Sequence, residues 1–257
     1  MMWLKPGVHR SLVYLAAGIV VSLSPFSAAR AATCPADPAM PALSLPHLRA
    51  ALMAGAQGVI VALGSSSTQG AAASTPAESY PAVLQTDLSA GLPDIHVAVL
   101  NRGMGGQDAP RELDRIEADV IAVRPQLVVW QVGTNAALRH MDAEAFHADV
   151  VVGVRRAQAA GIDVVLMDNQ RSPRVLAAGT EDVAIDQALA RAAEETGASL
   201  FSRDHLMLAW EAQGAAPAEF TSPDKLHHND RGYRCLARSL ARAIVRAVRP
   251  QSLVAGP

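Results

Sequence analysis

Five short runs of apolar residues recur along the chain, and they constrain its fold more than any other feature. The runs are mostly rich in Val and Ile, alternate little with polar residues, and cover 58–63, 95–100, 127–132, 162–167 and 198–201. This pattern is typical of strands that are buried on both faces of a parallel sheet. The segments between and after these runs show helical spacing and cover 76–90, 109–124, 142–160, 181–196 and 231–248.

The boundaries of these segments support the same interpretation. Gly91, Gly161 and Gly197 follow helical segments, and Pro125 follows another, which are typical helix stops. Strands that alternate with helices predict right-handed crossovers and a doubly wound sheet. We therefore expect an α/β protein in three layers, α/β/α, around a mostly parallel five-stranded sheet. No repeat or linker divides 57–250, which we interpret as one domain preceded by a lead-in segment at 32–56.

The first 31 residues have the three parts of a secretory signal. Lys5 and Arg10 make the start basic, an apolar run follows from about Ser11 to Leu23, and Ala29-Arg30-Ala31 supplies a small-residue cleavage site. The apolar run is short for a membrane span, which needs about 20 residues, although an uncleaved anchor is the alternative. We expect a periplasmic or secreted protein without stable membrane insertion after signal cleavage.

Export gives the two cysteines a structural meaning. Cys34 and Cys235 are the only cysteines of the chain, and an oxidising compartment favours a disulfide between them. Such a bond would tie the start of the exported chain to the last helix, and the alternative is two unrelated thiols.

The net charge of −2 and an aromatic content of 4% give no support to a nucleic-acid partner.

Polar and glycine-rich turns follow the predicted strands where functional groups of such sheets gather. The sequence Gly-Ser-Ser-Ser-Thr-Gln-Gly covers 64–70, Asn-Arg-Gly-Met-Gly-Gly covers 101–106, and Gly-Thr-Asn covers 133–135. Near the C-terminus, Asp224 and His227 are three residues apart. Each turn alone is a weak signal, because glycine-rich turns and loop asparagines are common.

In this order the four turns resemble the blocks of the SGNH (GDSL-type) hydrolases, a family of esterases with a flavodoxin-like fold. The resemblance runs from about Val59 to Ala247. It implies that Ser66 is the nucleophile and that Asp224 and His227 complete a catalytic triad. It also implies an oxyanion hole made by Ser66, Gly103 and Asn135, with no cofactor and no metal.

The chemistry of these residue types agrees with the resemblance. A serine hydroxyl needs a base to take its proton, and that base needs an orienting partner. Asp224 can fix the tautomer of His227 and stabilise the imidazolium. The Ser66 and Gly103 N–H groups and the Asn135 amide are the expected donors to the oxyanion.

Two residues depart from the family pattern. Ser65 precedes the nucleophile where the family usually has Asp, and Ala136 follows Asn135 where Asp is frequent. Neither position is a nucleophile, base or oxyanion donor in the family mechanism. If the loop lies at the surface, solvent screens the charge of an added carboxylate, and Ser65→Asp is then expected to be tolerated.

The same residues allow three other interpretations. A metal hydrolase would use Asp224, His227, His228 and Asp230, but no helical His pair supports it. Nucleotide binding is disfavoured because the turn at 64–70 lacks the phosphate-binding lysine and spacing. A non-catalytic domain binding glycan or lipid would not need the triad residues.

The expected function is an exported serine esterase acting on small-molecule, glycan or lipid esters, with a polysaccharide O-acetylesterase as the alternative.

Overall fold

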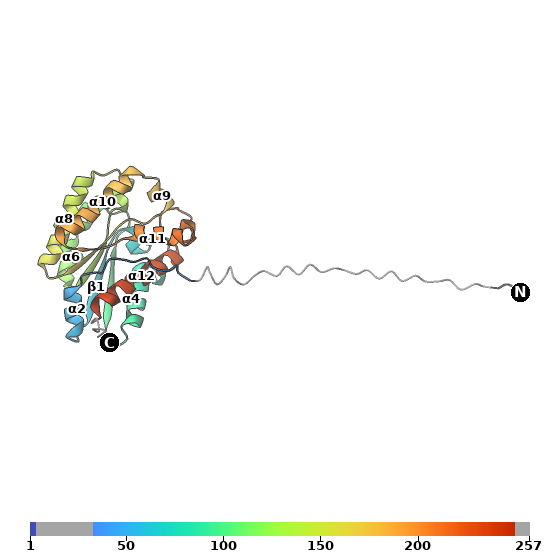
Figure 1. Ribbon diagram of the computed structural model, residues 1–257, viewed down its shortest axis with the longest axis horizontal. Coiled ribbons are helices and arrows are strands. Elements are labelled where there is room, and N and C mark those ends of the chain that lie inside the picture. Colours follow the sequence, from blue (N-terminus) through green and yellow to red (C-terminus); the bar gives the residue numbers. More distant parts are fainter. Residues whose placement is uncertain (4–32, 250–257) are drawn as a thin grey trace, which may run out of the picture. The chain divides into compact units, whose positions relative to one another are not determined.

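The computed structural model describes residues 1–3 and 33–249, and its centre is a parallel five-stranded sheet (Figure 1). The strands are β1 (Gly58–Gly64), β2 (Val97–Gly103), β3 (Leu127–Gln131), β4 (Asp163–Met167) and β5 (Ser199–Phe201). Their order is β2-β1-β3-β4-β5, and every neighbouring pair is parallel. This is the order of flavodoxin-like sheets, so the predicted fold class is confirmed.

Helices connect and flank the strands. The α-helices are α2 (Pro46–Met53), α3 (Ser66–Gln69), α4 (Tyr80–Gly91), α5 (Ala109–Asp114), α6 (Ile116–Asp119), α7 (Thr134–Leu138), α8 (Ala143–Ala159), α9 (Pro173–Leu176), α10 (Thr180–Thr196), α11 (Arg203–Ala212) and α12 (Asp230–Val248). The short 3₁₀ helices are η1 (Pro76–Glu78), η2 (Ile121–Val123) and η3 (Pro217–Glu219). No helix in 33–249 is both long enough and apolar enough to cross a membrane.

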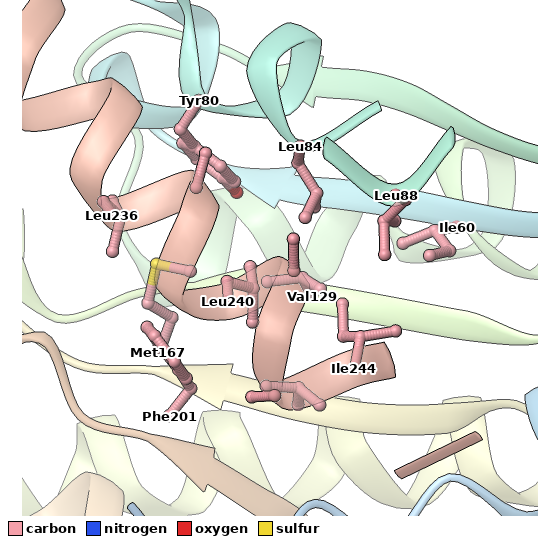
Figure 2. Packing of buried hydrophobic residues seen from close by; sticks show 14 of the residues in the cluster. Ile60, Tyr80, Leu84, Leu88, Val129, Met167, Phe201, Leu236, Leu240 and Ile244 are labelled. Carbon is pink, nitrogen blue, oxygen red and sulfur yellow. The ribbon is translucent and has the colours of Figure 1, made fainter. Parts of the chain in front are cut away.

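The sheet carries one hydrophobic core on each face, because successive side chains of a strand point to opposite sides. In β1, Ile60 lies in the core shared with α2, α4 and α12, whereas Val61 lies in the core shared with α8 and α10. Figure 2 shows the first core, where Leu84 and Leu88 of α4 and Leu236, Leu240 and Ile244 of α12 pack beside the sheet. Burial on both faces explains why β1, β3 and β4 lack polar alternation.

One helical prediction is wrong in detail. The segment 109–124 is not a single helix: it is divided into α5, α6 and η2, with Arg115 at the first break. There, the Arg115 side chain donates hydrogen bonds to the Gly64 carbonyl and to Gln107 Oε1, at 3.0 and 2.6 Å. The break therefore coincides with contacts to the end of β1 and to the loop that follows β2.

The register of the sheet brings the ends of three strands together. Gly64, the last residue of β1, pairs with Gly103 of β2 and with Gln131 of β3. The turns that follow these strands consequently start at the same level of the same edge. The predicted signal at 1–31 lies outside the described residues except for 1–3, and the proposed domain boundaries stay predictions.

Candidate active site

Ser66 is the first residue of α3, directly after the turn at the end of β1. The turn needs glycine at position 64, because a Cβ there would lie 2.3 Å from Thr68 Oγ1 and 2.8 Å from the Gln131 carbonyl oxygen. Close packing of β1, α3 and β3 thus fixes where the helix begins. It leaves Ser66 half-buried at the edge of the sheet.

Ser65 occupies a different environment from the one expected. Its side chain is only 3% exposed, so the assumption of a surface loop is wrong. The Ser65 N–H and hydroxyl both donate to Gln131 Oε1, at 3.4 and 3.3 Å, and Thr68 donates to the same oxygen. Gln131 braces the nucleophile turn from β3, and its presence in an apolar run is the sequence signal that could have revealed it.

The loop before α12 presents His227 to Ser66. His227 Nε2 lies 2.8 Å from Ser66 Oγ, and His227 Nδ1 lies 2.6 Å from Asp224 Oδ2. With the proton on Nδ1 held by the carboxylate, Nε2 is free to accept the serine proton. The structure therefore brings Ser66, Asp224 and His227 into one chain of hydrogen bonds, in the order needed for nucleophilic catalysis.

Asp224 is anchored by several donors within its own loop. Its Oδ1 accepts from the Ser222 hydroxyl at 2.6 Å and from the Leu226 and His227 N–H groups at 2.8 and 3.0 Å. Partial burial raises the pKa of Asp224, but the hydrogen bonds from Ser222 and His227 outweigh that effect and hold it well below its ordinary value. The carboxylate is therefore charged and oriented toward His227.

The Gly103 N–H, which the sequence predicts as an oxyanion donor, already has a partner in this structure. The Gly103 N–H donates to Asn101 Oδ1 at 2.9 Å, a local turn typical of Asn followed two residues later by an N–H donor. A Cβ on Gly103 would lie 2.0 Å from the Gln69 N atom, so its missing side chain admits the backbone of α3. Gly103 packs the nucleophile helix against β2, and its N–H is already used.

The next turn offers an alternative donor near Ser66. A Cβ placed on Gly105 would lie 4.0 Å from Ser66 Cβ, and Gly105 is exposed. Gly106 has φ of +75°, a conformation that favours glycine. Within the described residues, the N–H groups of Gly105 and Gly106 donate no hydrogen bond. The three glycines at 103, 105 and 106 left this register ambiguous in the sequence.

Asn135 lies in α7, after β3, as predicted. Its Nδ2 donates to the Gln107 carbonyl oxygen at 2.6 Å, which places the amide beside the turn that contains Gly105 and Gly106. An amide nitrogen has two N–H groups, so one is left for a substrate. The following residue, Ala136, is buried in the core on the α8 and α10 side, where its methyl group packs among apolar residues.

The four residues of the alternative metal site are not arranged as ligands. His228 is buried, and its Nδ1 lies 3.1 Å from the Phe220 carbonyl oxygen. Burial lowers the pKa of His228 to about 3, so the ring is neutral. Asp230 instead accepts a hydrogen bond from the Ser74 N–H. Among the described residues no group of three or more His, Cys, Asp or Glu could hold a metal ion.

The structure contains a disulfide between Cys34 and Cys235, the pair proposed from the sequence. The two Cα atoms lie 5.4 Å apart, and 201 positions separate the cysteines in the chain. Cys235 is fully buried in α12, one and a half turns after the helix begins. The bond joins the segment before α2 to the helix that directly follows the His227 loop.

Comparison with solved structures finds the same fold in several esterases. A two-domain esterase active on acetylated mannans is 21% identical, with a TM-score of 0.69 over 84% of this chain and 58% of its own. An acetyl-xylooligosaccharide esterase from Geobacillus, in a mutant form, is 21% identical, with a TM-score of 0.60 over 74% and 94%. A lipolytic protein of the G-D-S-L family from Desulfitobacterium hafniense is 20% identical, with a TM-score of 0.59 over 72% and 98%.

The sequence comparisons give the family. No curated protein matches the chain, whereas the model of the Non-GDSL lipase-like family matches residues 31–250. This match agrees with Ser65 standing where the GDSL pattern has Asp. It confirms the resemblance to SGNH (GDSL-type) hydrolases and the predicted class of enzyme, a carboxylic-ester hydrolase. The chain belongs to the Non-GDSL lipase-like family.

Proposed function

We propose that the protein is a serine esterase that forms an acyl-enzyme on Ser66. The observation that carries the proposal is the pair of hydrogen bonds from Ser66 to His227 and from His227 to Asp224, at 2.8 and 2.6 Å. A domain that only binds glycan or lipid has no need for a nucleophile, a base and an orienting carboxylate in one line. This arrangement favours the catalytic interpretation over the binding one.

The reaction would follow from these contacts in two steps. Ser66 Oγ attacks the acyl carbonyl carbon while His227 Nε2 takes the hydroxyl proton, and the carbonyl oxygen becomes an oxyanion. When the bond to the alcohol breaks, His227 gives the proton to the leaving oxygen. Water then attacks the acyl group with His227 again as base, which releases the carboxylic acid and restores Ser66.

The oxyanion would be bound by Ser66 N–H, by the Asn135 amide and by an N–H of the Gly105–Gly106 turn. The free N–H groups of that turn and its position beside Ser66 support this assignment in place of Gly103. Each such donor contributes about 10²- to 10³-fold to turnover in serine hydrolases.

Substitution of Ser66 tests the mechanism directly. Ser66→Ala should abolish hydrolysis of p-nitrophenyl acetate while the melting temperature stays close to that of the wild type. Ser67→Ala is the matched control, because Ser67 is the buried neighbour and its hydroxyl bonds to Tyr233, whereas His227 bonds to Ser66. A fluorophosphonate probe should label Ser66 in the wild type and in Ser67→Ala. Full turnover in a folded Ser66→Ala enzyme would contradict the proposal.

O-acetylated polysaccharide is the substrate class that the neighbours favour. Two of them are described by activity on acetylated mannans or acetyl-xylooligosaccharides. We propose that this chain removes acetyl groups from such a glycan. Release of acetate from acetylated mannan and acetylated xylan, measured beside p-nitrophenyl esters from acetyl to palmitoyl, tests this. Preference for palmitoyl esters with no acetate release would favour a lipid substrate.

Export is the second part of the proposal. The signal pattern at 1–31 supports it, and the Cys34–Cys235 disulfide suits an oxidising compartment. Expression of the full chain in a Gram-negative host, followed by N-terminal sequencing, should show a mature protein in the periplasm that starts after Ala31. An uncleaved chain in the membrane fraction would indicate an anchor instead.

A further inference from the structure

Two side chains of one short helix contact two consecutive carbonyl groups of the turn beside Ser66. Asn135 Nδ2 donates to the Gln107 carbonyl oxygen at 2.6 Å, and Arg139 Nη2 donates to the Gly106 carbonyl oxygen at 2.6 Å. Asn135 and Arg139 are four residues apart, which places them on the same face of α7 and its C-terminal end. Within the described residues, no other side chain contacts these two carbonyl oxygens.

The Arg139 guanidinium is itself held in place by a second contact. Its Nη1 lies 2.5 Å from Asp108 Oδ2, and Asp108 is the residue directly before α5. Arg139 therefore ties the Gly106 carbonyl to the start of the next helix. Because Arg donates through a planar fork, it can hold two acceptors at a fixed separation, whereas Lys offers a single ammonium group.

Gly106 is a position where such support has consequences. Gly106 has φ of +75°, and without a side chain its backbone can also adopt other conformations. The contacts of this residue therefore decide which conformation it takes. Rotation of this residue would swing the peptide groups on either side of it. One of those groups carries the Gly106 N–H, which donates no hydrogen bond within the described residues, and it adjoins Gly105, the glycine that lies near Ser66.

We propose that Arg139 is a positioning residue that holds the Gly105–Gly106 turn in the orientation that binds the oxyanion. The inference rests on the proposed function, because an oxyanion forms only if Ser66 attacks an ester. Arg139 touches neither Ser66 nor His227, so it would act on the reaction only through the turn. Its side chain is 41% exposed, so its removal leaves no cavity in either core.

Arg115 also contacts the turn, but its substitution would be a poor test of how the turn is held. It donates to Gln107 Oε1 and to the Gly64 carbonyl and also pairs with Asp119 at 2.6 Å, in a largely buried position. Its removal would leave buried acceptors unpaired and destabilise the fold. Arg139 allows the orientation of the turn to be changed without that loss.

Arg111 provides a matched control for Arg139. It also faces Asp108, at 4.0 Å, but forms no hydrogen bond with Gly106. Arg139→Met keeps much of the side-chain stem and removes both donors. We expect Arg139→Met to lower kcat by about tenfold or more with KM changed less than about twofold, and Arg111→Met to change neither. Arg139→Lys should retain intermediate activity, because one donor remains.

Binding of phenylboronic acid separates positioning from a general structural effect. The acid forms a tetrahedral adduct on an active serine and so resembles the transition state. Its inhibition constant should rise in Arg139→Met by the same factor as kcat/KM falls, while the melting temperature stays near that of Arg111→Met. Equal kcat and equal inhibition by the boronic acid in Arg139→Met and Arg111→Met would overturn the inference.

Ser66→Ala assayed in parallel distinguishes the two proposals. If Ser66→Ala is inactive and Arg139→Met has normal kcat and boronic-acid binding, only the positioning role fails. If Ser66→Ala turns over normally, the proposed mechanism fails, and the role of Arg139 fails with it.

Discussion

Ser66 Oγ and His227 Nε2 lie 2.8 Å apart, although 161 positions separate the two residues in the chain. Ser66 follows β1, the first strand of the chain, whereas His227 lies in a loop beyond the last strand, β5. The loop reaches the nucleophile because Gln170 donates to the Leu226 carbonyl oxygen at 3.0 Å and Arg174 N–H donates to that of Lys225. The segment after β4 thus holds the loop that contains His227 through two hydrogen bonds.

We expect kcat/KM to rise with pH in a single step, because the mechanism needs a neutral base beside Ser66. The ring must be neutral at Nε2 to accept the proton of Ser66. Asp224 adds no second step, because its hydrogen bonds hold its pKa well below the ordinary value and it is charged throughout. The measurement is kcat/KM for a short p-nitrophenyl ester from about pH 5 to pH 9. Two resolved acid steps would show that another group near Ser66 must lose a proton.

Ser65→Asp should destabilise the protein, in contrast to the tolerance expected for a surface loop. The new carboxylate would lie in a buried turn and face Gln131 Oε1, an acceptor that already serves Ser65 and Thr68. We expect a loss of about 1–3 kcal/mol in the free energy of unfolding, measured in urea. Ser65→Ala is the control, since it keeps the N–H contact to Gln131. Equal stability of the two variants would show that the Gln131 amide turns round and donates to the carboxylate.

Glu112→Gln should remove part of the pH dependence of stability. Burial raises the pKa of Glu112 to about 8, even though Trp130 Nε1 donates to its Oε2 at 2.7 Å. Between its unfolded pKa, near 4.5, and about 8, the folded state keeps a proton that the unfolded chain releases. Wild-type stability therefore falls as pH rises through this window, by up to about 1.4 kcal/mol per pH unit from this group. The variant should lack that contribution in urea unfolding at pH 5 and pH 8, and identical slopes would contradict the assignment.

Replacement of both Cys34 and Cys235 by Ala should lower the free energy of unfolding by about 2–5 kcal/mol. The bond encloses a long segment, so its loss gives the unfolded chain much more freedom. The described triad contacts do not involve either cysteine, so kcat at 25 °C should stay within about twofold of the wild type. The double variant and the wild type would be compared by urea unfolding and by esterase assay. A large loss of kcat without loss of stability would show that the bond shapes the His227 loop.

The sheet could be predicted because apolar runs are a local pattern, whereas the candidate triad came from the resemblance to a known family. Each apolar run became a strand, and Ser66 and Asn135 lie at the same edge because parallel strands end there. Gly103 is the least supported of the predicted oxyanion donors for a physical reason: Asn101 Oδ1 accepts its N–H in a local turn, and two other glycines lie in the same block. The Asn two residues before Gly103 is a signal that could have excluded it.

Contacts that depend on side-chain reach could not be predicted. The burial of Ser65 depends on Gln131, which comes from a neighbouring strand 66 positions away. The hydrogen bond from Arg139 to Gly106 joins residues 33 positions apart, and nothing in the spacing indicates it. Sequence patterns predict the edge of the sheet at which a residue lies. The hydrogen-bond partner of its side chain depends on how the strands and helices pack.

The disulfide between Cys34 and Cys235 also determines whether the protein stays in one piece after a protease cuts its backbone once. Ser66 and His227 both lie between the two cysteines in the sequence. Exposed loops lie between Ser66 and His227 along the chain. A single cut in one of those loops would separate Ser66 and His227 into different fragments that are still joined through sulfur. The two halves of the site would then stay in one molecule and keep the high effective concentration of an intact chain. A nicked enzyme would run as one band without reductant and as two with it, and its activity would outlast the integrity of its backbone.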